Sequence, residues 1–426
     1  MTDGGCHGDS VTHVVIVGAS FSGLAVASDL ASYPDQFAVT LIDARSAWEF
    51  TPSLHEAIGS GRDPAALLTP IDVKLFAGSG RGKADVVLGR AVSLDGRAVV
   101  VQPPHGDVVR VDFDVLVVAC GSAYASPIRP GAEDDPDRPQ RLREIEAWSE
   151  RLGSATSVLI VGGGAVGVEL AGEVASRTAT APGGRRVVLA TAAGELVEDL
   201  PAYSRERARA ALVGMGVDVR VNCRAKAAGE TERFGTGTYA LTSADGASEE
   251  LRADAAIFCF GGAPNTAWLK GSAVNMDARG FVCRDAWLQA TSAADVYVVG
   301  DCALKPDAQR LASFAHFEGE YLAGLLAARR QTPAVGAPAA PAAEYTPPPR
   351  MVALSLGPWD GIFVYDSVAL PVPGFLVPYI KAAIESWFVR LLPMPYAILR
   401  LLPGDTHARL RTKPAREPRS VYPAAA

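Results

Sequence analysis

One sequence pattern occurs twice in this chain, and it limits the possible folds more than any other feature. The first copy is the apolar run Val14–Val17, followed by the segment Gly18–Gly23 and a helical pattern. The second copy is the apolar run Val158–Val161, followed by Gly162–Gly167 and another helical pattern. An apolar strand that leads through a glycine turn into a helix is the opening of a βαβ unit. The chain therefore contains two such units.

Each unit continues with a second apolar strand, at Val39–Asp43 in the first copy and at Val187–Thr191 in the second. Further apolar runs occupy residues 115–119, 255–260 and 296–299. Strands that alternate with helices predict parallel sheets covered by helices on both faces. We therefore expect an α/β fold with two Rossmann-like doubly wound domains, the second inserted into the first.

The composition excludes several other classes of protein. The 426 residues are 49% hydrophobic and 20% charged, which is typical of a globular chain of two or three domains. The net charge of -7 argues against nucleic acid as a partner, because phosphate binding needs a basic face. The 6 cysteines form no CxxC or CxxxxC pair, so neither a redox dithiol nor a metal site is expected.

The terminal segments bear on where the protein resides. Residues 1–10 have no basic region followed by an apolar run, so no secretory signal is predicted. The longest uncharged run near the C-terminus, Ser367–Ile380, is shorter than the roughly 18–20 residues of a membrane-spanning helix. We expect a cytoplasmic protein.

The first glycine segment has the residues of a dinucleotide site. Gly18 permits a tight turn, and Gly23 lets the helix pack closely on the strand. Ser20 replaces the middle glycine and is small enough to let a pyrophosphate approach the N–H groups at the helix N-terminus. Asp43 ends the second strand, where its carboxylate can accept hydrogen bonds from ribose hydroxyls. These four residues together predict nucleotide binding.

The second glycine segment matches the full GxGxxG pattern, with Gly162, Gly164 and Gly167 at its three glycine positions. Thr191 stands where Asp43 stands in the first unit. This strand end thus has no carboxylate to repel a 2′-phosphate, and the preference between NADH and NADPH stays open.

Later segments resemble those of a known family. Two dinucleotide sites followed by residues 295–303, which include Gly300 and Asp301, resemble the two-dinucleotide-binding-domain, FAD/NAD(P)-dependent pyridine nucleotide-disulfide oxidoreductases. Residues 119–122, with Gly121, and residues 261–266 resemble the family's linker motifs. The resemblance covers about residues 12–330. It implies FAD in the first domain, NAD(P)H as electron donor in the second, and contact of Asp301 with the FAD ribityl chain or pyrophosphate.

The resemblance also sets the expected domain boundaries. The two parts of the FAD-binding domain are expected at residues 1–122 and 281–330, and the NAD(P)H-binding domain at 123–280. The Pro- and Ala-rich residues 331–349 predict a linker. Residues 350–426 predict a C-terminal α+β cap with a membrane or dimer surface.

Three segments narrow the resemblance to branches of the family. The missing CxxxxC pair excludes the disulfide reductases. Residues 163–173 and 312–323 resemble type II NADH:quinone dehydrogenases, but Ser313 and Phe317 stand where that branch has two glutamines. Residues 354–361 resemble the ferroptosis-suppressor branch of apoptosis-inducing-factor-like flavoproteins, whose members reduce quinones with NAD(P)H and associate with membranes.

The resemblance implies an oxidoreductase that passes a hydride from NAD(P)H through FAD to a quinone or similar lipophilic acceptor. Glu169 is the first catalytic candidate, because its position points toward nicotinamide and flavin in similar proteins; the alternative is a helix-surface carboxylate. His316 and Glu320 lie on one helix face and are candidates for proton handling at the acceptor side. The alternative is a histidine that only packs near the flavin. His55 falls where the family approaches the flavin ring.

The C-terminal segment from Phe375 to Leu392 has an apolar face that Lys381, Glu385 and Arg390 interrupt, and six basic residues follow between Arg400 and Arg419. An amphipathic segment with basic flanks suits peripheral contact with an anionic membrane. The alternatives are a homodimer face or a cover over the flavin domain.

Two other functions remain open. One is a flavoprotein reductase of a small redox protein or of a biosynthetic substrate, which the replaced glutamines motivate. The other is an NAD(P)H-sensing signalling protein similar to apoptosis-inducing factor.

Overall fold

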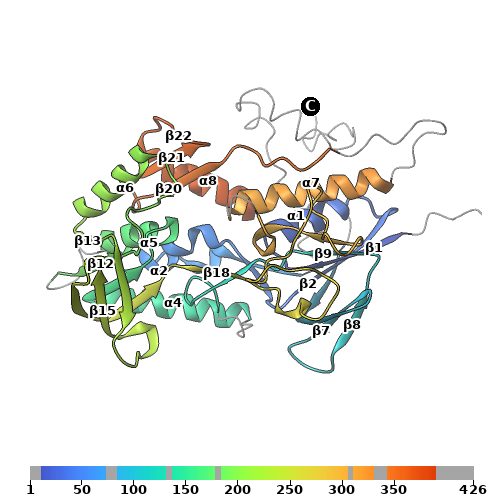
Figure 1. Ribbon diagram of the computed structural model, residues 1–426, viewed down its shortest axis with the longest axis horizontal. Helices are drawn as coiled ribbons and strands as arrows, with labels where there is room; N and C mark the ends of the chain where they lie inside the picture. The colour runs from blue at the N-terminus through green and yellow to red at the C-terminus, as the bar shows by residue number, and fades with distance from the viewer. Residues whose placement is uncertain are drawn as a thin grey trace, which may run out of the picture.

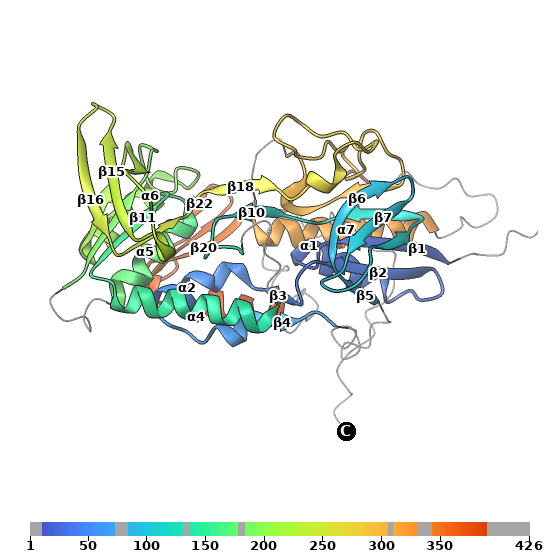
Figure 2. The same cartoon turned by 90° about the horizontal axis from the view of Figure 1, so that it is seen from below.

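The computed structural model describes residues 11–72, 84–130, 137–177, 184–305, 310–330 and 343–389. They form two parallel sheets, several small antiparallel sheets and a C-terminal unit (Figures 1 and 2).

The first large sheet has five parallel strands in the order β19-β9-β1-β2-β5. β1 lies at its centre, and its apolar residues 14–17 are buried because helices and loops cover both faces. The five strands are β1 (Thr12–Val17), β2 (Phe37–Asp43), β5 (Asp85–Leu88), β9 (Val115–Val118) and β19 (Val296–Val298).

Two helices pack against one another beside this sheet, namely α1 (Phe21–Leu30) and α7 (Ala312–Arg330) (Figure 1). They cross closely at Gly319, where an added Cβ would lie 2.5 Å from the backbone oxygen of Ser22. α1 is buried along most of its length, which explains its small and apolar residues.

The second large sheet has four parallel strands in the order β13-β12-β11-β17. These are β11 (Ser157–Val161), β12 (Arg186–Ala190), β13 (Val217–Arg220) and β17 (Ala255–Phe258), and the helices of this part are α4 (Arg138–Ser154), α5 (Ala165–Ser176) and α6 (Ala202–Gly214). All four strands fall between β9 and β19 in the sequence, so one doubly wound unit interrupts the other. The predicted fold class is confirmed.

Small antiparallel elements complete these two parts. β10 (Ser122–Tyr124) pairs with β18 (Gly261–Pro264), so the two chain segments that connect the large sheets run side by side. Two three-stranded sheets belong to these parts. One consists of β6 (Arg90–Asp95), β7 (Ala98–Gln102) and β8 (Val109–Asp112), and the other of β14 (Cys223–Ala227), β15 (Gly237–Ser243) and β16 (Ser248–Ala253).

A short segment after β2 lies between the two large units (Figure 2). It contains β3 (Ala47–Glu49), α2 (Leu54–Gly59) and β4 (Leu68–Pro70), and α2 packs against both α4 and α5. α4 begins with a capping box, in which Asp137 accepts a bond from the N–H of Gln140 and the Gln140 side chain accepts one from the N–H of Asp137. Arg141 of α4 forms a buried ion pair with Glu49 of β3 at 2.8 Å. This pair fixes the segment against α4.

The C-terminal unit consists of β20 (Met351–Ser355), β21 (Gly361–Tyr365), β22 (Val368–Ala369) and α8 (Val377–Val389). Its three strands form an antiparallel sheet that docks on α5. The contact depends on Gly172, because a Cβ there would lie 2.5 Å from the backbone nitrogen of Gly357. None of the helices in the described part of the chain is long and apolar enough to cross a membrane.

The orientation of α8 differs from what its sequence suggests. Lys381 and Glu385, which interrupt the apolar face in the sequence, are buried and point inward together with Val377 and Phe388. The outward side and the turn before it carry exposed apolar side chains, namely Phe375, Leu376, Tyr379 and Ile384. The basic residues between Arg400 and Arg419 lie outside the described residues.

Candidate active site

The first glycine turn is shaped by two close backbone contacts. Gly18 has a φ of 112°, and a Cβ there would lie 2.3 Å from the carbonyl oxygen of Ala119. A Cβ at Gly23 would lie 1.8 Å from the oxygen of Gly18. Ser20 is the N-cap residue of α1, and its side chain makes no capping bond. The turn thus presents the N-terminus of α1, a favourable place for a pyrophosphate.

Asp43 braces this turn from the end of β2. Its Oδ2 accepts the N–H of Ala19 at 2.7 Å, and its Oδ1 accepts the N–H of Arg45 at 2.8 Å. A carboxylate oxygen can accept two hydrogen bonds, so each oxygen of Asp43 keeps a lone pair for a ribose hydroxyl. The residue predicted to hold the ribose therefore also holds the turn.

Asp301 and Gly121 approach this site from two other segments. Ser122 donates a hydrogen bond from Oγ to Oδ2 of Asp301 at 3.3 Å, which joins the two motifs. Gly121 has a φ of 64°, and a Cβ there would meet nothing within 4 Å. The two motifs are adjacent in space although far apart in the sequence, and open space faces one of them.

Two arginines near this site, Arg45 and Arg129, were not predicted from the sequence. Burial and the neighbouring charge of Arg45 both lower the pKa of Arg129. The Nε of Arg129 is buried and makes no hydrogen bond with any described residue. A half-buried guanidinium with an unbonded Nε, beside a second arginine, fits an anionic group such as the FAD pyrophosphate. With Gly18, Ser20, Asp43 and Asp301, these arginines would hold FAD.

Glu318 of α7 orders the turn that carries Gly300. Its Oε2 accepts the backbone N–H of Gly300 at 2.6 Å, and Arg284 donates to both carboxylate oxygens at 2.8 and 3.0 Å. Lys305 lies 3.1 Å from Oε1. Burial alone would raise the pKa of Glu318, but the two cations lower it below its usual value. The signal in the sequence is a glutamate on the buried face of a largely apolar helix.

The second glycine turn repeats the geometry of the first. Gly162 has a φ of 124°, and a Cβ at Gly167 would lie 1.9 Å from the oxygen of Gly162. A Cβ at Gly164, the N-cap residue of α5, would meet nothing within 4 Å. Thr191 is buried at the end of the adjacent strand. The open space at Gly164 fits a dinucleotide lying across the start of α5.

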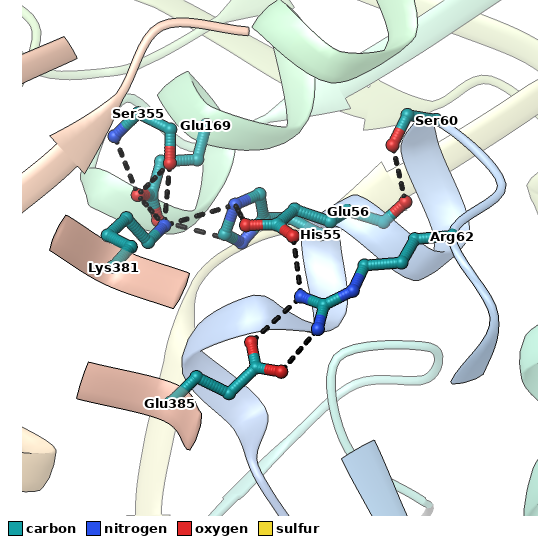
Figure 3. Close-up of polar contacts among 8 residues, drawn as sticks. All are labelled: His55, Glu56, Ser60, Arg62, Glu169, Ser355, Lys381 and Glu385. Carbon is teal, nitrogen blue, oxygen red and sulfur yellow. Dashed lines mark hydrogen bonds and ion pairs between the residues drawn. The ribbon is translucent and has the colours of Figure 1, made fainter. Parts of the chain in front are cut away.

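One turn further along α5, Glu169 belongs to a buried polar cluster (Figure 3). Lys381 of α8 donates from Nζ to Oε1 of Glu169 at 2.6 Å and to Oγ of Ser355 at 2.6 Å. Ser355, at the end of β20, donates its N–H and its hydroxyl to the same Oε1 at 3.0 and 3.1 Å. Burial alone would raise the pKa of Glu169, but Lys381 and its other partners lower it. Glu169 is therefore an ionised carboxylate whose Oε1 accepts three hydrogen bonds.

His55 of α2 completes this cluster. Its Nε2 lies 3.3 Å from Nζ of Lys381, and its Nδ1 lies 3.7 Å from Oε2 of Glu169 (Figure 3). An ammonium group only donates, so Nε2 accepts and the ring proton lies on Nδ1, facing Glu169. Burial and the charge of Lys381 lower the pKa of His55 to about 3. The imidazole is therefore neutral at physiological pH.

One turn after Lys381 on α8, Glu385 takes part in a second group of charged residues, which links α8 to α2 (Figure 3). Arg62 donates to Oε2 of Glu385 at 2.8 Å and to Oε2 of Glu56 at 2.7 Å, and its Nη2 also pairs with Oε1 of Glu385. The hydrogen bonds that Arg62 donates to Glu385 are the largest influence that raises the pKa of Arg62. α8 is thus fastened to α2 by Glu385 and to α5 by Lys381.

Glu173, one turn after Glu169 on α5, is also buried. Burial raises its pKa to about 7, with a further contribution from the charge of Glu56 and an opposing one from Ser60. This carboxyl group titrates near neutral pH beside the cluster.

His316 and Glu320 face each other on α7, with His316 Nε2 3.6 Å from Glu320 Oε1. The His316 ring packs edge-to-face on Phe388 of α8, with ring centroids 5.2 Å apart. Phe388 also contacts Phe21, beside the first glycine turn, at 5.3 Å. α8 therefore contacts both the Glu169 cluster and His316 of α7. The catalytic roles of Glu169, His316 and Glu320 stay proposals.

Lys381, Ser355 and Glu385 were not assigned to the site from the sequence. The available signal was a pair of opposite charges four residues apart within an apolar helix, which is typical of partnered inward-facing groups. Among the residues that the structure describes, no group of three His, Cys, Asp or Glu side chains is arranged to hold a metal ion.

The comparisons with known proteins decide the family. Residues 12–319 match the family model of pyridine nucleotide-disulphide oxidoreductases. The chain belongs to this family. Its members use FAD together with NAD(P)H, so the predicted cofactors are confirmed, and the protein is an oxidoreductase.

Among curated relatives of this oxidoreductase, oxidoreductase ptaL of Pestalotiopsis fici is 29% identical over 295 residues, which cover 68% of this chain and 76% of the relative. The nitric oxide reductase FlRd-NAD(+) reductase of Shigella flexneri is also 29% identical over 295 residues, covering 68% and 72%.

Solved structures share the fold over nearly the whole chain. The sulfide:quinone oxidoreductase of Aquifex aeolicus has a TM-score of 0.70 at 18% identity and covers 92% of this chain and 95% of its own. NDH2 of Plasmodium falciparum in complex with NADH has a TM-score of 0.70 at 12% identity and covers 90% and 97%.

Proposed function

We propose that this oxidoreductase passes a hydride from NAD(P)H through FAD to a quinone or similar lipophilic acceptor. The observation that carries the proposal is the two-sided C-terminal unit. Its inner side supplies Lys381 to the buried cluster beside the nucleotide sites. Its outer side exposes Trp359, Phe375 and Tyr379, whose side chains are 73%, 59% and 63% accessible. Large exposed apolar side chains on one unit are typical of a surface that meets another apolar phase.

The structural comparisons support this acceptor class. The sulfide:quinone oxidoreductase acts on a quinone by its printed name, and its similarity extends over 92% of this chain, beyond the 12–319 region that the family model matches. A quinone acceptor would gain access to the flavin along an apolar surface that also retains it near a membrane.

FAD supplies the hydride chemistry when it is bound. The residues of this chain would orient the two ligands and exclude water from the space between them. We propose that Glu169, held by Lys381 and Ser355, fixes the charge beside the nicotinamide, and that His316 and Glu320 handle protons on the acceptor side.

The test is an anaerobic stopped-flow experiment on the FAD-loaded protein. We expect NADH or NADPH to bleach the visible flavin absorbance, and a short-chain quinone to restore it at a rate that supports repeated turnover. If the flavin is not bleached, or if no quinone in a panel reoxidises it faster than air does, the proposal is wrong.

A second candidate is a reductase of a small redox protein. The relative from Shigella flexneri is named a nitric oxide reductase FlRd-NAD(+) reductase, and Ser313 and Phe317 replace the two glutamines of the quinone-reducing branch. The same stopped-flow experiment with a small iron–sulfur or iron protein as acceptor separates the two. Fast reoxidation by the protein and slow reoxidation by every quinone would favour this alternative.

We further propose that the exposed side of the C-terminal unit is a peripheral membrane contact. Full-length protein is expected to co-sediment with vesicles that contain anionic lipids, and a variant with Trp359, Phe375 and Tyr379 all changed to Ser to bind them less. A mass twice that of the monomer, reduced to the monomer by the same changes, would instead assign this surface to a homodimer.

A further inference from the structure

An exposed aromatic ring lies at the edge of the second large sheet, outside the clusters described above. Phe260 follows β17 by two residues and is 57% exposed, whereas Cys259 before it is 8% exposed. A single exposed phenylalanine is common on protein surfaces. What distinguishes Phe260 is its position relative to the second glycine turn.

The order of the strands places Phe260 at the crevice where a dinucleotide binds. β11 pairs in parallel with β12 on one side and with β17 on the other. The chain passes from β11 to β12 and β13 and only later to β17, so the strand order reverses between β11 and β17. In open α/β sheets, ligands bind outside the carboxyl ends of the strands at such a reversal. The glycine turn follows the carboxyl end of β11, and Phe260 follows that of β17.

Close backbone contacts hold the segment of Phe260 against the glycine turn. The N–H of Cys259 donates to the carbonyl oxygen of Val161 at 2.7 Å. A Cβ at Gly162 would lie 2.9 Å from the carbonyl oxygen of Cys259. This oxygen belongs to the peptide group that joins Cys259 to Phe260. The backbone of Phe260 is therefore adjacent to the turn that offers its N–H groups to a pyrophosphate.

Neighbouring residues support the ring of Phe260 on one side only. It packs edge-to-face on Phe258, with ring centroids 5.7 Å apart and an interplanar angle of 89°. Phe258 in turn contacts the fully buried Tyr239 at 6.2 Å. The next two residues, Gly261 and Gly262, have φ angles of 154° and 100° and carry no side chain that could cover the ring. They begin β18, which leads toward the FAD-binding unit (Figure 2).

We propose that Phe260 stacks on one of the two planar heterocycles of bound NAD(P)H, the adenine or the nicotinamide. Both have a flat π face, and an aromatic side chain stacks on such a face whatever groups the ring carries at its edge. The stack removes an exposed apolar ring from water and orients the dinucleotide on the glycine turn. It concerns the electron donor alone, so it does not depend on the identity of the acceptor.

Calorimetry with oxidised nucleotides tests the proposal on the FAD-loaded protein, because they bind without reducing the flavin. Phe260→Ala should bind NAD⁺ or NADP⁺, whichever the wild type binds more tightly, about tenfold or more weakly, the effect of losing one aromatic–base stack. Phe260→Trp should stay within about threefold of the wild type, since it keeps the stack. Its additional indole emission should fall when the nucleotide binds. Tyr203→Ala is the matched control, because Tyr203 is a 63% exposed aromatic residue on α6 of the same unit.

ADP-ribose, which keeps the adenine and lacks the nicotinamide, identifies the stacked ring. An equal loss of affinity for ADP-ribose in Phe260→Ala assigns the adenine, whereas a loss confined to the complete dinucleotide assigns the nicotinamide. Unchanged dinucleotide affinity in Phe260→Ala, or the same weakening in Phe260→Trp or Tyr203→Ala, would overturn the proposal. A failure of quinone to reoxidise the flavin would count against the proposed function alone, because no acceptor takes part in these measurements.

Discussion

Replacing Lys381 by Met tests whether the cluster holds the C-terminal unit to the rest of the protein. The Nζ–Oε1 distance to Glu169 is 2.6 Å, and both side chains are buried. Coulomb's law with an effective dielectric constant of about 20 gives about 6 kcal/mol for charges this close. Part of this lost attraction is offset, because the Met variant no longer has to bury a charged ammonium group away from water. Removing one partner of a buried pair costs about 3–5 kcal/mol in other proteins.

The Met variant is therefore expected to lose about 3–5 kcal/mol of unfolding free energy, since Glu169 keeps only its two bonds from Ser355. The assay is urea denaturation of the FAD-loaded protein, followed by both flavin and tryptophan fluorescence. Glu169→Gln and the double variant complete a double-mutant cycle. We expect the double variant to be more stable than the sum of the two single losses predicts, by about 2 kcal/mol or more.

The result that would refute the reasoning is a loss below about 1 kcal/mol with no coupling in the cycle, as for an exposed pair. Glu385→Gln is the matched control on the same helix face, because its partner Arg62 is 33% exposed in its side chain. Glu385→Gln should lower the unfolding free energy by less than Lys381→Met does.

Three other predictions follow from the same geometry. Glu173 keeps its proton to about pH 7 when folded but ionises near its ordinary value of 4.5 when unfolded, so stability falls as pH rises between these values. The unfolding free energy of Glu173→Gln, measured by urea titration, should therefore rise by about 2–3 kcal/mol relative to that of the wild type between about pH 5 and about pH 8. A difference between the two proteins that stays constant over this pH range would contradict the prediction. Gly164→Ala should fold normally, and calorimetry should show that it binds NADH at least about tenfold more weakly. Gly167→Ala should instead lower the melting temperature, because its Cβ would lie 1.9 Å from a backbone oxygen. Glu318→Gln should release FAD more readily in equilibrium dialysis, since Arg284 loses its ionic partner; unchanged retention would show that the turn at Gly300 holds by itself.

The sequence was sufficient for the elements whose signals are local. The two glycine turns, the strands before them and Asp43 all lie within short segments, and their contacts in the structure are those that the residue types require. The fold class follows from them, because parallel strands need helical crossovers.

Local signals could not assemble the centre of the candidate site, although the family resemblance indicated Glu169 and His55. Glu169, His55 and Lys381 come from three segments that no periodic pattern connects, and Ser355 gives no local signal at all. The apolar pattern of α8 was misleading, since a helix with exposed apolar residues and partnered charges inside has the same composition as one with the opposite orientation. Only the contacts with α5 and α2 distinguish the two.

The division of the cluster among α2, α5 and α8 has a consequence for how the protein matures. During synthesis, both nucleotide-binding units are complete before α8 leaves the ribosome. Until then Glu169 lacks its lysine, and α2 lacks the carboxylate that binds Arg62. A chain that stops before Lys381 would thus carry both glycine turns without the complete cluster of Glu169, His55 and Lys381. Among the described helices α8 is the last to be made, so the buried cluster is completed only after both nucleotide-binding units.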